Sequence, residues 1–147
     1  MPLKVFWDPF SSDDFGPLIK VIVMPPAVEM DAGRLVGLEY PRPVPIKALI
    51  DTGSPFTIVN RVVAKNFNLR QTNPHVPLRT LGGPCTGEEY CCSMSFPGSD
   101  LPKIEVMGIV AADLKRERYY SCLIGRDVIR NWNIEFDGRS QCVTISA

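Results

Sequence analysis

The sequence predicts a mostly β protein, and three observations lead to this fold class. The 147 residues include 14 prolines and 11 glycines, which fall between short apolar runs as turns fall between strands. The clearest runs, Leu18–Met24 and Ile46–Ile50, are rich in the β-branched residues that favour strands. Only two segments have the pattern of short helices, namely residues 61–69 and the segment that begins with residues 125–127.

Each expected strand is a short apolar run bounded by turn residues. In chain order these strands are residues 18–24, 46–50, 56–59, 78–81, 90–96, 104–111, 122–124, 134–136 and 142–145. Asn60 is expected to cap the helix over residues 61–69. The last two strands are expected to form a hairpin around Asp137 and Gly138. Residues 27–43 are expected to form an irregular hairpin or loop, and residues 71–77 a loop.

Residues 1–17 show neither structural period and are expected to be an N-terminal extension, followed by one domain over residues 18–147. A chain of this length buries a core without disulfide or metal staples.

The five cysteines have no metal-ligand spacing, so no metal site is expected, and their odd number favours reduced thiols. A vicinal disulfide between Cys91 and Cys92 is less frequent than two small apolar residues in a strand. The single histidine, His75, is expected at the surface.

The charges and the hydropathy limit the expected partners. The 16 basic and 16 acidic side chains cancel, and no Lys/Arg block marks a phosphate-binding surface, so nucleic acid is not an expected partner. No apolar stretch approaches the roughly 20 residues that cross a bilayer, so no membrane partner is expected. The first ten residues lack a basic segment followed by an apolar one, which predicts a cytoplasmic protein.

The tetrapeptide Asp51-Thr52-Gly53-Ser54 directly follows the apolar run Ile46–Ile50. Alone, such a tetrapeptide usually marks an ordinary turn. Its weight comes from the order of the segments that follow it: a strand, a helix, a glycine-rich hairpin at residues 82–87, and then Leu123-Ile124-Gly125-Arg126-Asp127 before a terminal helix and strand. This order resembles that of the retropepsin family, the retroviral aspartic proteases and their cellular and bacterial relatives. The resemblance covers roughly residues 18–145.

The resemblance implies a closed β-barrel protomer with a glycine-rich flap hairpin and one or two short helices. It implies an aspartic endopeptidase that hydrolyses extended polypeptides as a homodimer, with one Asp-Thr-Gly per subunit and no cofactor. The catalytic carboxylate would be that of Asp51. Two carboxylates in contact cannot both ionise, so one acts as the acid while the other acts as the base on a water molecule.

The resemblance also assigns roles to the neighbouring residues. Thr52 would bond across to the other subunit, and Gly53 would offer its carbonyl to the substrate. Ser54 is expected to place its hydroxyl beside the Asp51 carboxylate, with an acid-shifted pH optimum as the result. The flap residues Gly82, Gly83, Pro84 and Cys85 would close over the substrate, although a surface turn has the same composition. The segment Leu123-Ile124-Gly125 would pass behind the Asp51 loop, although a core strand ending at a helix fits the same residues.

One position departs from the family pattern. Viral members pair the arginine of the Gly-Arg segment with an acid two residues beyond the Asp-Thr-Gly triplet, but Pro55 stands there in this chain. Arg126 is therefore expected to pair with Asp127, Glu135 or Asp137, or to point to solvent.

Two other interpretations remain open. The chain can be a noncatalytic dimerisation or peptide-binding module that keeps the fold, or a latent precursor in which residues 1–17 cover the cleft. A second catalytic aspartate within the chain is not expected, because neither Asp127 nor Asp137 stands in an Asp-Thr/Ser-Gly context.

Overall fold

The computed structural model describes residues 1–8, 16–80, 82–114 and 119–147. The described residues form ten strands and three helices, so this part of the chain is mostly β, as expected. In chain order the elements are β1 (Leu3–Phe6), β2 (Leu18–Met24), α1 (Ala27–Leu35), β3 (Ile46–Ile50), β4 (Ile58–Asn60), α2 (Arg61–Asn66), β5 (Arg70–Thr80), β6 (Gly83–Ser95), β7 (Ile104–Ala112), β8 (Cys122–Ile124), α3 (Arg126–Ile129), β9 (Asn133–Asp137) and β10 (Cys142–Ser146).

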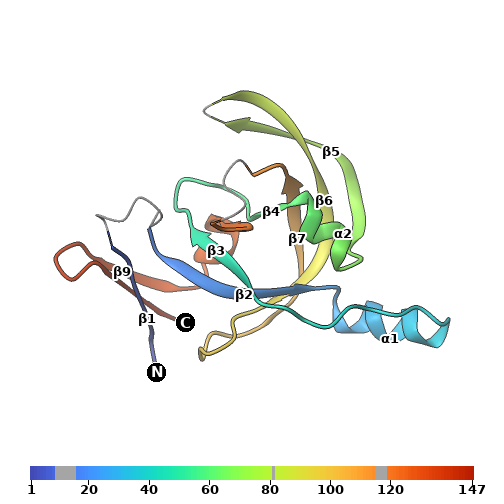
Figure 1. Cartoon of the computed structure of the whole chain (residues 1–147), viewed down its shortest axis with the longest axis horizontal. Coiled ribbons are helices and arrows are strands. Elements are labelled where there is room, and N and C mark those ends of the chain that lie inside the picture. Colours follow the sequence, from blue (N-terminus) through green and yellow to red (C-terminus); the bar gives the residue numbers. More distant parts are fainter. Residues whose placement is uncertain (9–15, 81, 115–118) are drawn as a thin grey trace.

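Seven strands form one sheet in the order β2-β3-β8-β4-β7-β6-β5 (Figure 1). β2 also pairs with β6, which closes six of these strands into a barrel and leaves β5 on its outside. The β3–β8 and β4–β7 pairs are parallel, whereas the other pairs in this sheet are antiparallel. The barrel therefore places β8 between β3, which leads into Asp51, and β4, which follows the Asp51 loop.

The core fills the barrel with side chains that alternate along the strands. Val21, Val59, Met94, Ile109 and Ile124 are completely buried and belong to one apolar cluster. This alternation sets the register, because a shift by one residue would turn each of these side chains to the other face of its strand. A second, smaller cluster lies apart from the core and consists of Leu78, Val110 and Ala112, with Ile58 and Val76 packed against them.

The two ends of the chain build a separate three-stranded sheet in the order β1-β10-β9. β1 pairs with β10 so that Leu3 stands opposite Ile145. Residues 1–17 were expected to be an extension or an interface arm, and no strand was bounded within them, because an alternation over only four residues is too short to identify. Leu3 and Val5 nevertheless pack against the core, which explains the pairing. Residues 9–15 of the expected extension lie outside the described residues.

The expected loop at residues 27–43 was wrong in its first half, which is the helix α1. The carbonyl of Pro26 accepts the first helical hydrogen bond from the Met30 N–H, at 3.0 Å. Glu29 in the first turn and Arg34 in the last turn both suit the helix dipole. Gly33 suggested a turn in the sequence, but here it makes room for Tyr40, whose hydroxyl a Cβ at Gly33 would overlap.

The expected loop at residues 71–77 was also wrong, because these residues belong to β5. The β5–β6 register is irregular between Gln71 and Asn73 and again between Asn73 and Val76. The Asn73 side-chain oxygen accepts the His75 N–H at 3.0 Å within this irregular stretch. Prolines are tolerated here because β5 is an edge strand, whose outer side needs no N–H donors.

Other expected elements are confirmed with small shifts of their ends. Asn60 caps α2, and its side chain accepts the Val62 N–H at 3.2 Å, but the helix ends at Asn66 rather than at residue 69. The terminal hairpin forms, with the Asp137 carboxylate accepting the N–H groups of Arg139 and Ser140 in its turn. The glycine-rich loop is shorter than expected, because β6 already begins at Gly83. Leu81, the expected end of a strand, lies outside the described residues.

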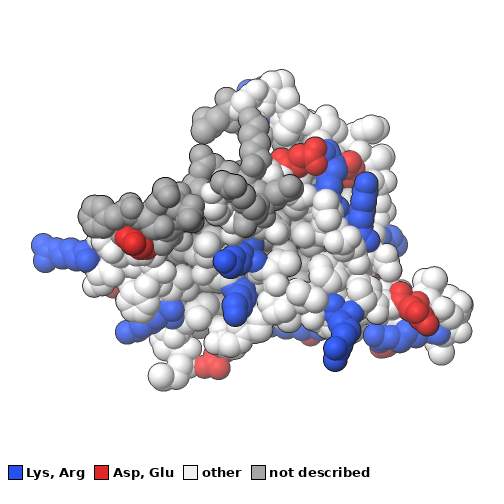
Figure 2. Space-filling model, in the orientation of Figure 1, with Lys and Arg blue, Asp and Glu red and all other residues white. Residues whose placement is uncertain are grey.

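The surface mixes charged and uncharged side chains. Figure 2 shows basic side chains in small groups over this face, with acidic ones at several places between them. All five cysteines are free thiols, and only Cys85 is exposed. No helix in the described ranges is both long enough and apolar enough to pass through a membrane.

Candidate active site

The Asp51 loop begins where β3 leaves the barrel, and it is held by its own backbone. The Asp51 N–H donates to the Ile124 carbonyl at 2.9 Å, and the Ser54 N–H closes a turn on the Asp51 carbonyl at 3.2 Å. The Gly53 N–H donates to the Asp51 carboxylate at 3.0 Å. Asp51 is half-buried, whereas Thr52 and Gly53 are exposed. The loop thus fixes one carboxylate at the end of a buried strand and leaves its tip open to a partner molecule.

The segment that joins β8 to α3 lies directly against this loop. The Arg126 N–H donates to the Ser54 carbonyl at 2.8 Å. At Gly125 a Cβ would overlap the carbonyl group of Phe56 and lie 2.8 Å from the Ser54 carbonyl oxygen. Only glycine permits this approach, so the two segments pack backbone to backbone. Leu123, Ile124 and Gly125 are therefore brought next to residues 51–56, which lie about 70 positions away in the sequence.

A buried polar network supports the same crossing. Thr57 is completely buried, and its hydroxyl donates to the Asp127 carboxylate at 2.7 Å while accepting the Gly125 N–H at 3.1 Å. The Asp127 carboxylate also accepts the N–H groups of Thr57 and Val128. Asp127 is thus a structural residue of the site. Sequence reasoning missed Thr57, although one polar residue within the apolar run of residues 56–59 was a usable signal.

The expected role of Ser54 was wrong in this structure. Its hydroxyl donates to the Phe56 carbonyl at 2.6 Å instead of to the Asp51 carboxylate. The side chain is nearly buried, at 9% exposure, which fits a residue that closes the turn rather than one that touches substrate. The stated reason for an acid-shifted pH optimum is thereby removed.

Arg126 also has a different partner from the carboxylates that were expected. Its Nη1 donates to the Thr52 carbonyl at 3.3 Å. The Asp127 carboxylate is occupied by Thr57 and Val128, and that of Asp137 by Ser140 and Arg139. The guanidinium therefore binds the Asp51 loop itself.

The expected flap residues lie at the far end of the β5–β6 hairpin. The Thr80 hydroxyl donates to the Gly83 carbonyl at 2.8 Å across the tip, and Gly83 has a φ of +108°, which glycine adopts without strain. Gly82, Pro84 and Cys85 are exposed beside it. In Figure 1 this hairpin curves above β4 and the loop that follows β3.

Apolar side chains extend from β3, the strand that leads into Asp51, to the root of this hairpin. Leu49, Leu123 and Ile58 are aligned across β3, β8 and β4, and each is half-buried. Ile58 continues into the small cluster around Val110 and Leu78. This apolar strip lies on the face of the sheet that points away from the core, so it can contact apolar side chains of a bound molecule.

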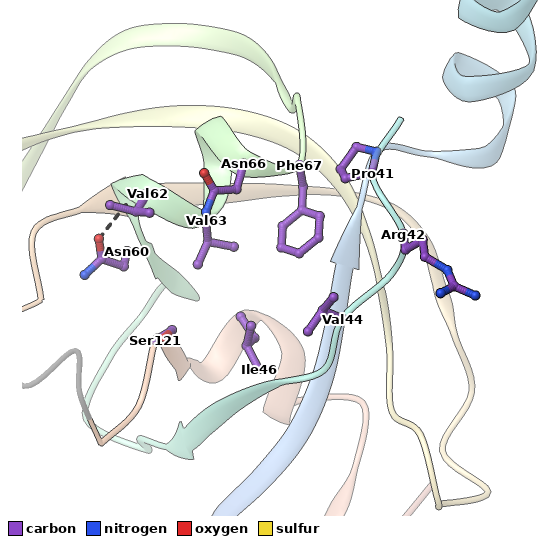
Figure 3. Close-up of a pocket in the computed structure, with 10 residues that line it drawn as sticks. All are labelled: Pro41, Arg42, Val44, Ile46, Asn60, Val62, Val63, Asn66, Phe67 and Ser121. Carbon is purple, nitrogen blue, oxygen red and sulfur yellow. Dashed lines mark hydrogen bonds between the residues drawn. The ribbon is translucent and has the colours of Figure 1, made fainter. Parts of the chain in front are cut away.

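A groove of about 660 Å³ lies elsewhere, between α2 and the segment that enters β3 (Figure 3). Val44 and Ile46 face Val63 and Phe67 across it. Asp51 does not line it, because Ile46 stands at the opposite end of β3, about 16 Å away at the usual strand rise. The described residues also contain no group of three His, Cys, Asp or Glu that could hold a metal ion.

Comparisons with known proteins support the fold and no more. No protein-family model matches the chain, and no curated protein matches it. Among solved structures, it is similar to the EIAV protease complexed with the inhibitor HBY-793, with a TM-score of 0.51 and 13% sequence identity. This match covers 86% of the present chain and 93% of that protease. The chain therefore has a retropepsin-like fold.

Proposed function

We propose that this chain is an aspartic endopeptidase and that Asp51, together with Thr52 and Gly53, forms its half of a shared active site. The observation that carries the proposal is the position of Asp51 within the retropepsin-like fold. Its carboxylate stands at the end of β3, in a loop whose backbone is bonded to Ile124 and Arg126. We place the peptidase domain at residues 18–147, with β1 contributing a strand to the terminal sheet.

The reaction requires two carboxylates that share one proton. The ionised one takes a proton from a water molecule, whose oxygen attacks the scissile carbonyl, and the protonated one donates to the carbonyl oxygen. When the tetrahedral intermediate collapses, its C–N bond breaks, the amine nitrogen takes the proton from the carboxyl group that received it from water, and the other carboxylate recovers its proton from the intermediate's hydroxyl. The carboxylates of Asp127 and Asp137 already accept two or more hydrogen bonds each, that of Asp127 from Thr57 and Val128 and that of Asp137 from the residues of its own turn. The second carboxylate is therefore the Asp51 of a second copy, which makes the active unit a homodimer.

The substrate is an extended polypeptide with apolar side chains near the cleaved bond. The apolar strip of Leu49, Leu123 and Ile58 offers contacts for such side chains beside Asp51. The β5–β6 hairpin acts as the flap, and its backbone bonds the peptide in the manner of an added strand. A charged side chain against the strip would lose hydration without gaining a partner, so apolar residues are preferred.

Cleavage of a mixed peptide library tests the proposal. The wild type is compared with Asp51→Asn and with the control Asp31→Asn, which makes the same change at an exposed position of α1. The protein is assayed above its dimerisation concentration, which sedimentation measures, and with and without pepstatin. We expect Asp51→Asn to lose at least about 10²–10⁴-fold in kcat, the range of general acid–base catalysis, while Asp31→Asn retains activity.

Two results would contradict the proposal. Equal cleavage by the wild type and by Asp51→Asn would exclude Asp51 as the catalytic group. A dimeric wild type that binds peptides without cutting any of them would favour the noncatalytic peptide-binding module instead.

A further inference from the structure

The β5–β6 hairpin has an attached part and a free part. β6 pairs with β7 from Glu88 onward, with Glu88 opposite Ala111. Before Glu88, β6 pairs only with β5, from Gly87 opposite Val76 to Gly83 opposite Thr80. The free hairpin, defined here as residues 76–80 and 82–87, thus extends about 16 Å beyond the barrel at the usual strand rise.

The strand pairing at the joint between the two parts is irregular. The β5–β6 register is broken between Asn73 and Val76, just before the free hairpin begins. Pro74 and Pro77 remove two backbone donors around this break. On the β6 side, Gly87 passes so close to β7 that a Cβ would lie 2.7 Å from the Ala111 carbonyl oxygen. The strand pairing at the joint is therefore irregular on the β5 side and packed closely against β7 on the β6 side.

Besides the apolar contact of Leu78 with Val110 and Ala112, a charged side chain bridges this joint. Arg61, the first residue of α2, donates through Nε to both oxygens of Glu88, at 3.0 and 2.9 Å. Its Nη2 donates to the Thr86 carbonyl at 2.7 Å, and its Nη1 pairs with Asp113 at 2.7 Å. The side chains of Arg61 and Glu88 are only 29% and 25% exposed. The guanidinium therefore binds Glu88, where the pairing of β6 with β7 begins, and Thr86 of the free hairpin at the same time.

Arg61 also belongs to the segment that carries the active site. It follows β4, whose strand partners are β8 and β7, and it stands ten positions after Asp51. A planar guanidinium fixes angles as well as distances, because its donors have a rigid fork geometry. An ammonium group at this position would keep the charge but lose the fixed direction.

We infer that Arg61 is a positioning residue, which fixes the free hairpin relative to the loop of Asp51 by binding Glu88 and the Thr86 carbonyl at its root. An effect of Arg61 on catalysis rests on the proposed peptidase function. The orientation of the free hairpin by Arg61 does not, since the same contacts orient the hairpin whether or not Asp51 catalyses a reaction.

Hydrogen exchange measured by mass spectrometry on the full chain tests the orientation of the free hairpin by Arg61. We expect Arg61→Ala to exchange about tenfold faster in the free hairpin, which corresponds to about 1.4 kcal/mol, with β9 and β10 unchanged. Arg61→Lys should fall between Arg61→Ala and the wild type. The control Arg70→Ala removes the other ion pair to this hairpin, with Glu29 of α1. It should leave the free hairpin unchanged, because Arg70 lies in the attached part.

Glu88→Gln provides a second variant in case Arg61→Ala folds poorly, and it should also speed exchange in the free hairpin. Unchanged exchange there in both folded variants would overturn the inference, and so would an equal increase in every strand. If the chain is an endopeptidase, Arg61→Ala should raise KM several-fold with a smaller change in kcat. Altered exchange in an inactive protein would contradict the peptidase proposal and leave the role of Arg61 intact.

Discussion

The α-carbon of Gly125 lies so close to the Phe56 backbone that a methyl group at this position would overlap the Phe56 carbonyl. The contact joins the segment between Asp51 and β4 to the segment that precedes α3. Because both partners are backbone, neither can move aside as a flexible side chain would. The stability of the site therefore depends on a missing side chain at one position.

Gly125→Ala should destabilise the protein by roughly 1–3 kcal/mol, the usual cost of overpacking. The matched control is Gly138→Ala, because a Cβ at Gly138 meets no atom within 4 Å. Urea denaturation of both variants and the wild type measures the difference. Equal free energies of unfolding for the two variants would show that the Gly125 contact is not needed.

Thr57→Val should cost about 1–3 kcal/mol of stability, although the two side chains have nearly the same shape. The change leaves the Gly125 N–H without its acceptor and removes one donor from the Asp127 carboxylate in a buried region. Thr144→Val, at a half-exposed position of β10, makes the same chemical change as a control. In thermal unfolding, Thr57→Val should have a lower Tm than Thr144→Val. Thr57→Ser should have a Tm close to that of the wild type, because it keeps the hydroxyl.

The turn between β9 and β10 should show a defined dependence on pH. Hydrogen bonds from the Ser140 hydroxyl, and then from backbone N–H groups, lower the pKa of Asp137 below its usual value of 3.8. A lowered folded-state pKa stabilises the fold above the unfolded-state value, and this stabilisation is lost as the pH falls through the folded-state pKa. Ser140→Ala should raise the pKa of Asp137, which NMR titration of the carboxyl carbon can follow. The same pKa in both proteins would contradict the hydrogen bond.

Thiol labelling should distinguish one cysteine from the other four. Cys85 is exposed beside the hairpin tip, whereas the other four are at most 8% exposed. Burial also raises the pKa of Cys92 and Cys122, which disfavours the reactive thiolate. Native protein should therefore react quickly with one equivalent of a maleimide, at Cys85, and unfolded protein with five. Rapid labelling of Cys92 in the native state would contradict its place in the core.

The sequence predicted the parts of the fold that depend on local pattern. The run of β3 into Asp51 and the terminal hairpin were identified, because apolar alternation and turn residues lie close together in the chain. α1 was missed because Gly33 suggested a turn, and its packing against Tyr40 becomes visible only in three dimensions. β1 was missed because its partner, β10, lies at the other end of the chain.

The candidate site was predicted as a set of residues but not as a set of contacts. Residues 51–54 and 123–127 are indeed neighbours in the structure. The hydrogen-bond partners of Ser54 and Arg126 could not be predicted, because both are backbone carbonyls. The Phe56 carbonyl comes within reach of the Ser54 hydroxyl through the local turn, and the Thr52 carbonyl comes within reach of Arg126 only after the two segments pack together. Residue type reveals which groups can donate, but not which acceptor lies within reach.

The pairing of β1 with β10 has a consequence for the way the protein is synthesised. β10 is the central strand of the terminal sheet, and it leaves the ribosome after every other element. Until then β1 and β9 have no partner, and closing a loop of nearly the whole chain carries a larger entropic cost than closing any local hairpin. The strands of the barrel can pair before β10 has been synthesised, whereas the sheet that joins β1 to β10 can form only afterwards, as a late step in folding.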